Sequence, residues 1–138
     1  MHEPIELLVV DSRAAMRDAL RVALELEDDI RVAGEAGDML AALRFAADGA
    51  ITLALVDSRL AGLQSPLGLD ALRALARRVA VVVMGTGDRA LYDAPYVEAG
   101  ASGYWAKDDD LDVLVGLLRA AADGRRRAGE RQARRRRP

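Results

Sequence analysis

The chain has 138 residues, of which 51% are hydrophobic and 30% are charged, and its formal net charge is −2. This length suits one domain with a hydrophobic core of its own. The absence of cysteine excludes disulfide bonds and thiolate metal sites, and the apolar runs are far shorter than the roughly 20 residues of a membrane span. We therefore expect a cytoplasmic protein that makes no membrane contact.

Apolar runs and amphipathic stretches alternate along the chain. In chain order they predict a strand over residues 5–10, a helix over 13–27, a strand over 30–36, a helix over 38–48, a strand over 51–57, a helix over 68–78, a strand over 79–84, a helix over 89–99, a strand over 102–106 and a helix over 108–123. Strand–helix units of this length form right-handed crossovers. The alternation predicts an α/β domain with a doubly wound five-stranded parallel sheet and helices on both faces.

Two details of the helices follow from the same pattern. In the helix over 38–48, we expect Leu40, Leu43 and Ala47 to face the core. The last helix should end at Gly124, because glycine commonly terminates helices. Beyond it, residues 125–138 hold eight arginines and one glutamate. We expect residues 1–124 to form the domain and residues 125–138 to be a disordered tail without nucleic-acid contact, because no aromatic residue in it could stack on bases.

Four polar residues follow the predicted strands: Asp11, Asp57, Thr86 and Lys107, which is the single lysine beside 19 arginines. The carboxyl ends of parallel strands share one edge of the sheet, so these side chains should lie together. Any one of them alone is better explained by a strand end reaching water. The combination suits phosphoryl transfer to Asp57, with a divalent cation held by Asp11 and Asp57 and the phosphoryl oxygens bound by Thr86 and Lys107.

Four motifs carry a resemblance to a known family: Leu8-Val-Val-Asp11, Leu55-Val-Asp57, Thr86 after Val81-Val-Val-Met84, and Gly100-Ala-Ser-Gly-Tyr104-Trp-Ala-Lys107. In these motifs the chain resembles the receiver domain of two-component response regulators, over about residues 5–124. Many receivers have proline directly after the lysine. With Asp108 at that position, the chain resembles the branch whose receivers precede a helix-turn-helix domain.

The resemblance implies a flavodoxin-like strand order of 2-1-3-4-5 and a signalling domain rather than an enzyme. It implies that a sensor histidine kinase or phosphotransfer protein phosphorylates Asp57, with Mg²⁺ at Asp11, Asp57 and the backbone carbonyl of Arg59. Thr86 and Tyr104 would act as a switch, with Tyr104 rotating inward. The fourth helix, fifth strand and last helix would then change partners, which are a downstream protein, a fused output domain or a second copy.

The chain departs from the family pattern beside this site. Ser12 stands where receivers usually carry a second acid that binds the metal, so the magnesium site should be weak or absent. The guanidinium of Arg59 could fold over the site and pair with Asp57 or Asp11. Two hypotheses stay open: a working phosphoacceptor with a weakened metal site, or a degenerate receiver that binds proteins without phosphorylation. We favour the first, because Asp57, Thr86 and Lys107 are all present.

Other functions on similar folds lack their required residues. The segment after the first strand is not the phosphate loop of a flavin binder, Asp57-Ser-Arg59 lacks the second acid of a dehalogenase-type phosphatase, and His2 is the only histidine available to a hydrolytic triad. Four aromatic residues gather near the fifth strand and form either an interface or part of the core: Tyr92, Tyr96, Tyr104 and Trp105.

Overall fold

The computed structural model describes residues 3–87 and 93–137. Within them the elements are, in chain order, β1 (Ile5–Val10), α1 (Ala14–Leu24), β2 (Ile30–Ala36), α2 (Met39–Ala47), β3 (Leu53–Asp57), α3 (Pro66–Arg78), β4 (Ala80–Gly85), α5 (Ala94–Glu98), β5 (Gly103–Ala106) and α6 (Leu111–Arg135). The helix predicted over 89–99 falls partly outside the described residues. In its described part, Pro95 lies in the first turn of α5, where a missing backbone donor is tolerated.

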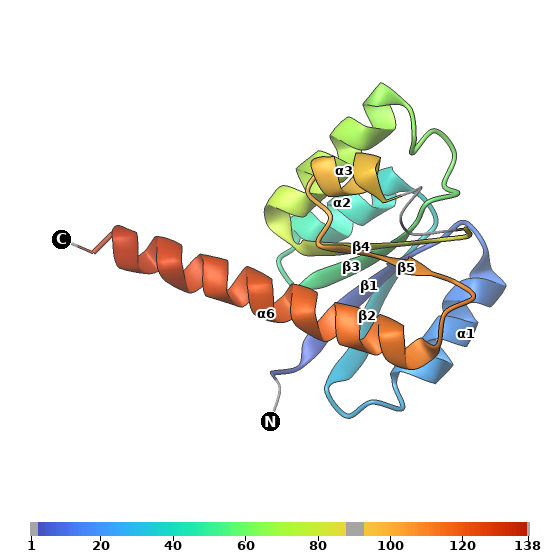
Figure 1. Cartoon of the computed structure of the whole chain (residues 1–138), viewed down its shortest axis with the longest axis horizontal. Coiled ribbons are helices and arrows are strands. Elements are labelled where there is room, and N and C mark those ends of the chain that lie inside the picture. The colour runs from blue at the N-terminus through green and yellow to red at the C-terminus, as the bar shows by residue number, and fades with distance from the viewer. Residues whose placement is uncertain (1–2, 88–92, 138) are drawn as a thin grey trace.

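All strand pairs of the sheet are parallel, and the strand order is β2-β1-β3-β4-β5. The predicted fold class and strand order are confirmed, with β2 at an edge. Helices α2, α3 and α5 cover one face, and α1 and α6 cover the other (Figure 1). Every residue of β3 and β4 is buried, as expected for strands covered on both faces.

The two faces of the sheet carry separate hydrophobic clusters. One includes Ala42, Leu72 and Tyr96, and the other includes Leu20 and Leu114. Among the described residues, no helix is long and apolar enough to cross a membrane.

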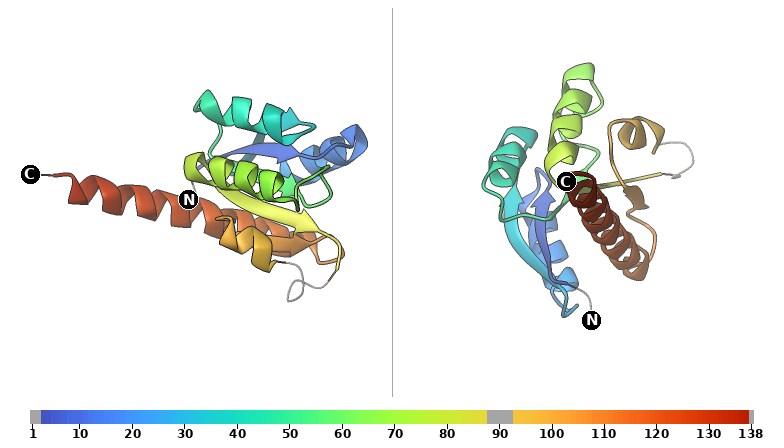
Figure 2. Two further views of the ribbon diagram at one scale, coloured as in Figure 1. Left: turned by 90° about the horizontal axis from the view of Figure 1, so that it is seen from above. Right: turned by 90° about the vertical axis from the view of Figure 1, so that its left-hand side faces the viewer.

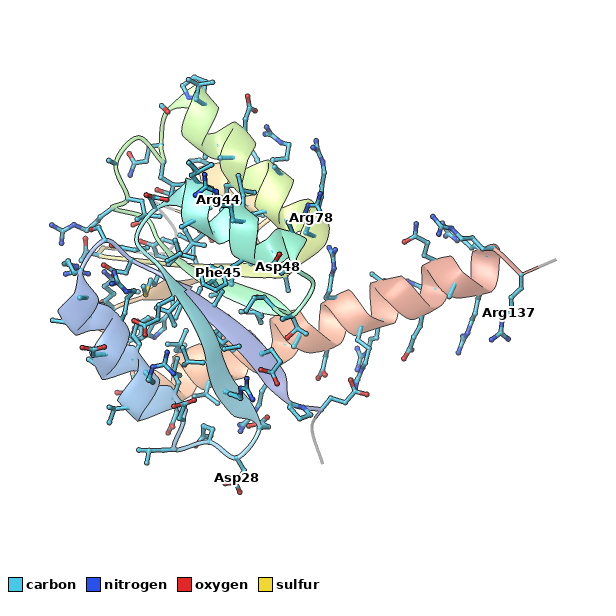
Figure 3. The ribbon with its side chains drawn as sticks, turned by 180° about the vertical axis from the view of Figure 1, so that it is seen from behind. Asp28, Arg44, Phe45, Asp48, Arg78 and Arg137 are labelled. Atoms are coloured by element: carbon cyan, nitrogen blue, oxygen red, sulfur yellow. The ribbon has the colours of Figure 1, made fainter. Side chains whose placement is uncertain are left out.

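The face that helix α2 presents to the core differs in part from the predicted one, since only Leu43 of the three expected residues packs against the core, half-buried. Ala42 and Ala46 are buried, whereas Leu40 is 60% exposed and Ala47 is exposed. The side chain of Asp38 accepts a hydrogen bond from the backbone N–H of Ala41 at 2.8 Å and fixes the start of the helix. Apolar residues occur on more than one side of α2, so the sequence pattern did not specify which side packs against the sheet. Phe45 projects from α2 toward β2 (Figure 3), where an added Cβ on Gly34 would lie 3.0 Å from its ring.

The prediction that the last helix ends at Gly124 is wrong, because α6 continues to Arg135. A glycine inside a helix costs only about 1 kcal/mol relative to alanine, and the arginine, alanine, glutamine and glutamate residues that follow favour helix. Residues 125–135 are therefore helical rather than disordered. Figures 1 and 2 show this part of α6 projecting away from the sheet, and Figure 3 shows Arg137 at its far end.

The first turn beyond Gly124 is tied to the body of the domain. Arg125 donates hydrogen bonds to the carbonyl oxygens of Ala76 and Arg77, at 3.0 and 2.6 Å, where α3 ends. These carbonyls lack partners inside their own helix, so the guanidinium satisfies them. The expectation that the arginine-rich segment makes no nucleic-acid contact stays a prediction.

Candidate functional site

The four strand-end residues lie at one edge of the sheet. Asp11 follows β1, Asp57 ends β3, Thr86 follows β4 and Lys107 follows β5. Asp11 and Asp57 are buried, at 0% and 1% exposure, although both carry carboxylates. Buried charges need partners nearby, and the site is defined by what supplies them.

Lys107 supplies the first partner. Its Nζ atom donates a hydrogen bond to Oδ1 of Asp57 at 3.0 Å, and the lysine side chain is only 14% exposed. The backbone N–H of Lys107 donates to the carbonyl of Gly85 at 2.8 Å, which extends the pairing of β4 with β5 and fixes where the side chain begins. The backbone N–H of Arg59 also donates to Oδ1 of Asp57, at 3.3 Å.

Arg13 supplies the second partner, and the sequence analysis did not single it out. Its Nε donates to Oδ1 of Asp11 and its Nη2 to Oδ2, both at 3.1 Å, so the guanidinium binds the carboxylate side-on. The same Nη2 lies 3.7 Å from Oδ2 of Asp57. The backbone N–H of Arg13 donates to Oδ1 of Asp11 at 2.8 Å, which forms an Asx turn. The signal available in the sequence was an arginine two residues after a strand-end aspartate.

These contacts shift the pKa values of Asp11 and Arg13. Burial alone would raise the pKa of Asp11, but the hydrogen bonds and positive charge of Arg13, with a smaller effect from Lys107, outweigh it and hold that pKa below its ordinary value of 3.8. The pKa of Arg13 is raised by its hydrogen bonds to Asp11. Both groups are therefore charged at neutral pH.

The guanidinium in the site belongs to Arg13 and not to Arg59, as the sequence analysis had considered. Arg59 is exposed and meets Asp57 through its backbone N–H. The loop after Asp57 folds through successive turns, with N–H groups donating from Leu60 to Asp57 and from Leu63 to Leu60. The charged side chains at this edge are thus two carboxylates and two cations, while Ser12 is exposed and neutral.

Thr86 and Tyr104 meet at the end of β4. Thr86 is exposed, and its carbonyl oxygen accepts a hydrogen bond from the Tyr104 hydroxyl at 3.3 Å. Tyr104 is 2% exposed and stacks on Tyr96, with ring centroids 6.2 Å apart. The ring of Tyr104 thus lies inward in this structure, and its rotation as a switch stays a prediction. A Cβ on Gly85 would collide with the Tyr104 hydroxyl and would lie 2.5 Å from Oγ of Ser58, so this position needs glycine.

The aromatic residues do not form an exposed patch. Tyr96, Tyr104 and Trp105 are all buried, and the indole N–H of Trp105 donates to the carbonyl of Asp110 at 3.2 Å. Tyr92 lies outside the described residues. Of the two alternatives, burial is correct for the three residues that the structure describes.

A model of the response regulator receiver domain matches residues 7–119. The chain belongs to this family. The receiver is 34% identical over 131 residues to the nitrate/nitrite response regulator NarP of Escherichia coli, covering 93% of this chain and 60% of NarP. The receiver thus spans about three fifths of the length of this relative.

Solved structures share the fold of this chain. The NarL receiver domain of Mycobacterium tuberculosis is 26% identical with a TM-score of 0.75, covering 88% of this receiver and 98% of that chain. A LuxR-family response regulator from Aurantimonas is 24% identical with a TM-score of 0.77, covering 88% of this receiver and 87% of that chain.

Membership fixes the general role of this receiver. Receiver domains are signalling modules of two-component systems that are phosphorylated on an aspartate. They interact with histidine kinases or phosphotransfer proteins and with output domains, and they generally bind Mg²⁺ at acidic residues.

Proposed function

We propose that this receiver accepts a phosphoryl group on Asp57 and passes the signal to a protein partner. The observation that carries the proposal is the contact between Asp57 and Lys107, whose Nζ lies 3.0 Å from Oδ1. A buried carboxylate at a strand end beside a half-buried ammonium is an arrangement that can both present a nucleophile and bind the phosphoryl oxygens that arrive on it.

The two oxygens of Asp57 are in different surroundings. Oδ1 accepts hydrogen bonds from Lys107 and from the backbone N–H of Arg59, whereas Oδ2 faces Nη2 of Arg13 at 3.7 Å. We assign the attack to Oδ2, because its lone pairs are less engaged by these donors. The ammonium of Lys107 and the hydroxyl of Thr86 then bind oxygens of the transferred group, which carries more negative charge than the carboxylate it joins.

In the transfer step, Oδ2 of Asp57 forms a bond to phosphorus while the bond between phosphorus and a histidine nitrogen of the donor breaks. The electron pair of that bond stays on the nitrogen, which takes up a proton and becomes neutral imidazole. The products are an acyl phosphate at Asp57 and an unphosphorylated donor, which is a sensor histidine kinase or a phosphotransfer protein. No oxidant or reductant is needed.

The output surface comprises α5, β5 and α6. Thr86 and Tyr104 connect it to the site, because the Tyr104 hydroxyl donates to the Thr86 carbonyl directly beside the phosphoacceptor edge. Val97 on α5 and Val113 on α6 are 50% and 45% exposed and suit contact with a downstream protein, a fused output domain or a second copy. The proposal gives the arginine-rich segment no role in nucleic-acid binding.

The second candidate is a degenerate receiver that binds its partner without phosphorylation. One observation favours it: the guanidinium of Arg13 lies within 3.1 Å of Asp11 and 3.7 Å of Asp57, so the site already contains ion pairs without a phosphoryl group. A stable charge arrangement of this kind would hold one conformation permanently. Direct phosphorylation separates the two candidates.

The test is incubation of the full chain with phosphoramidate or acetyl phosphate, with and without MgCl₂, followed by intact-protein mass spectrometry. Wild type should gain one phosphoryl group and Asp57→Asn none. The matched control is Asp48→Asn, the same change at the exposed C-terminal cap of α2, which should be phosphorylated like wild type. No mass gain in wild type under either condition overturns the proposal in favour of the degenerate receiver.

A further inference from the structure

The space between the two buried carboxylates of the site is occupied by a side chain of the chain itself. Nη2 of Arg13 lies 3.1 Å from Oδ2 of Asp11 and 3.7 Å from Oδ2 of Asp57. At such a site Asp11 and Asp57 would hold a magnesium ion, whose positive charge would offset theirs. The guanidinium therefore stands where a divalent ion would have to bind.

Arg13 is held in this position by local structure as well as by charge. Its backbone N–H donates to Oδ1 of Asp11 at 2.8 Å, and its Nε donates to the same oxygen at 3.1 Å. Arginine presents its donors in a rigid planar fork, so little freedom is lost when it binds a carboxylate side-on. Arg17 adds a hydrogen bond at 2.6 Å to the backbone carbonyl of Asp11, which anchors the end of β1.

The donor set does not fit magnesium. This ion requires near-octahedral oxygen ligands at about 2.0–2.1 Å and gives up its water reluctantly, so it needs a concentration of negative charge. Here the formal charges of Asp11 and Asp57 are matched by Arg13 and Lys107, and the residue after Asp11 is the exposed, neutral Ser12. Within the described part of the chain, no group of three or more histidine, cysteine, aspartate or glutamate residues is placed to hold a metal ion.

We propose that Arg13 is the built-in replacement for the divalent cation of this site, and that the receiver does not take magnesium between Asp11 and Asp57. The inference rests on the proposed function in that it concerns the cation of the same site. Magnesium binding is measured on the unphosphorylated chain. Its result therefore tests this inference independently of whether Asp57 is phosphorylated. The state of the site then depends on the position of one side chain and not on the supply of metal.

The test is titration with MgCl₂ at constant ionic strength, followed by ¹H–¹⁵N NMR of the full chain. Wild type should show no saturating shifts below about 10 mM, a concentration at which a 1 mM site would be almost filled. The side-chain Nε–H signal of Arg13 should be visible and unchanged by magnesium, because the Asp11 carboxylate keeps it bound.

Two substitutions should create the missing site. Ser12→Asp supplies the third carboxylate, and Arg13→Gln removes the guanidinium with a similar chain length. The double variant should bind magnesium at least tenfold more tightly than wild type, with shifts at the backbone amides of Asp11, Asp57 and Arg59. The matched control is Arg44→Gln, the same loss of charge on the exposed face of α2 (Figure 3), which should show no saturating shifts below about 10 mM, like wild type.

Saturating shifts at Asp11 and Asp57 in wild type below about 10 mM would overturn the inference. If the double variant does not fold, the wild-type titration decides alone. A magnesium-dependent loss of the Arg13 Nε–H signal would show the metal displacing the guanidinium and would equally count against it.

Discussion

The hydroxyl of Tyr104 donates a hydrogen bond to the carbonyl oxygen of Thr86 at 3.3 Å, so the buried ring of the predicted switch residue is fastened to the residue that follows β4. The ring also stacks on Tyr96 with an interplanar angle of 13°. The inward position of Tyr104 is therefore supported by two contacts. Any outward state must give up both of them.

Gly85 is the residue that makes room for this tyrosine. In Gly85→Ala, the new Cβ would collide with the Tyr104 hydroxyl and with Ser58, so one of them must move. We expect a loss of about 1–3 kcal/mol in the free energy of unfolding, as for other overpacked sites. Urea unfolding followed by Trp105 fluorescence measures it.

Two further variants make the cause visible. Tyr104→Phe in the Gly85→Ala background removes the closest atom and should recover part of the loss. Gly116→Ala is the matched control, because nothing lies within 4 Å of its added Cβ in α6, and it should stabilise the protein by about 0.5–1 kcal/mol. Equal losses at Gly85 and Gly116 would contradict the packing explanation.

Lys107 balances the buried charge of Asp57. Lys107→Gln leaves that carboxylate without its ammonium, and the site is nearly closed to water, since the two side chains are 14% and 2% exposed. We expect a loss of about 2–3 kcal/mol in the free energy of unfolding, below the roughly 3–5 kcal/mol seen for fully buried pairs, because Arg13 remains nearby. Chemical denaturation at pH 7 is the measurement.

The double variant Lys107→Gln with Asp57→Asn replaces the ion pair by two neutral amides. It should be more stable than Lys107→Gln alone, because no buried charge is left unpaired. A double variant that is less stable than either single one would mean that hydrogen-bond geometry, rather than charge balance, dominates at this edge.

Glu35 makes the stability of the edge strand depend on pH. The hydrogen bond from Arg21, at 2.8 Å, and that from Arg17, at 3.1 Å, lower the pKa of Glu35 below its ordinary value of 4.5 despite partial burial. A folded-state pKa below the unfolded one means that the unfolded chain binds more protons in this range. The stabilisation is therefore complete above pH 4.5 and is lost as the pH falls through the folded-state value.

The measurement compares wild type with Glu35→Gln by urea unfolding at pH 7 and at about pH 3.5. Wild type should be the more stable at pH 7, and the difference should shrink at the lower pH. In an Arg21→Gln background, where one partner cation is missing, the difference at pH 7 should already be smaller. A difference that grows toward low pH would refute the assignment to this cluster.

Arg125 should mark the end of the cooperative fold. Truncation after Arg126 keeps its hydrogen bonds to the end of α3 and should leave the free energy of unfolding within about 0.5 kcal/mol of the full chain, because the removed residues are exposed. Truncation after Gly124 removes the hydrogen bonds of Arg125. It should lower the free energy of unfolding by about 0.5–1.5 kcal/mol more than truncation after Arg126 does. Equal stability of the two truncated proteins would contradict the anchoring role.

The fold was predictable because its determinants are local and repeated. The strands end within a residue or so of Asp11, Asp57 and Lys107, since buried parallel strands are near-continuous apolar runs. Because the strands are parallel, their carboxyl ends bring these residues to one edge of the sheet. The side that α2 turns to the sheet was not predictable, because Leu40 and Ala42 are both apolar and only the packing distinguishes them. The helix beyond Gly124 was missed because its glycine is outweighed by its neighbours.

The strand-end residues of the candidate site were predictable, but Arg13 and its pairing with the two carboxylates were not. Motifs identified Asp57, Thr86 and Lys107, but which guanidinium reaches the carboxylates depends on how two loops turn. Arg59 sits in a loop whose turns place its side chain in solvent, whereas the Asx turn at Asp11 directs Arg13 inward. A sequence pattern records that an arginine is near and does not record its direction.

Helix α6 is held from both sides of the sheet. Arg119 donates to Asp29 and Glu27, which precede β2, and Arg125 donates to the end of α3 on the opposite face. The nine helical residues that project past Arg126 extend about 13 Å, so a rotation of about 10° at the anchors displaces the tip by roughly 2 Å. The direction of the projecting helix therefore depends on anchors at both faces of the sheet, and a change in their relative position would change that direction.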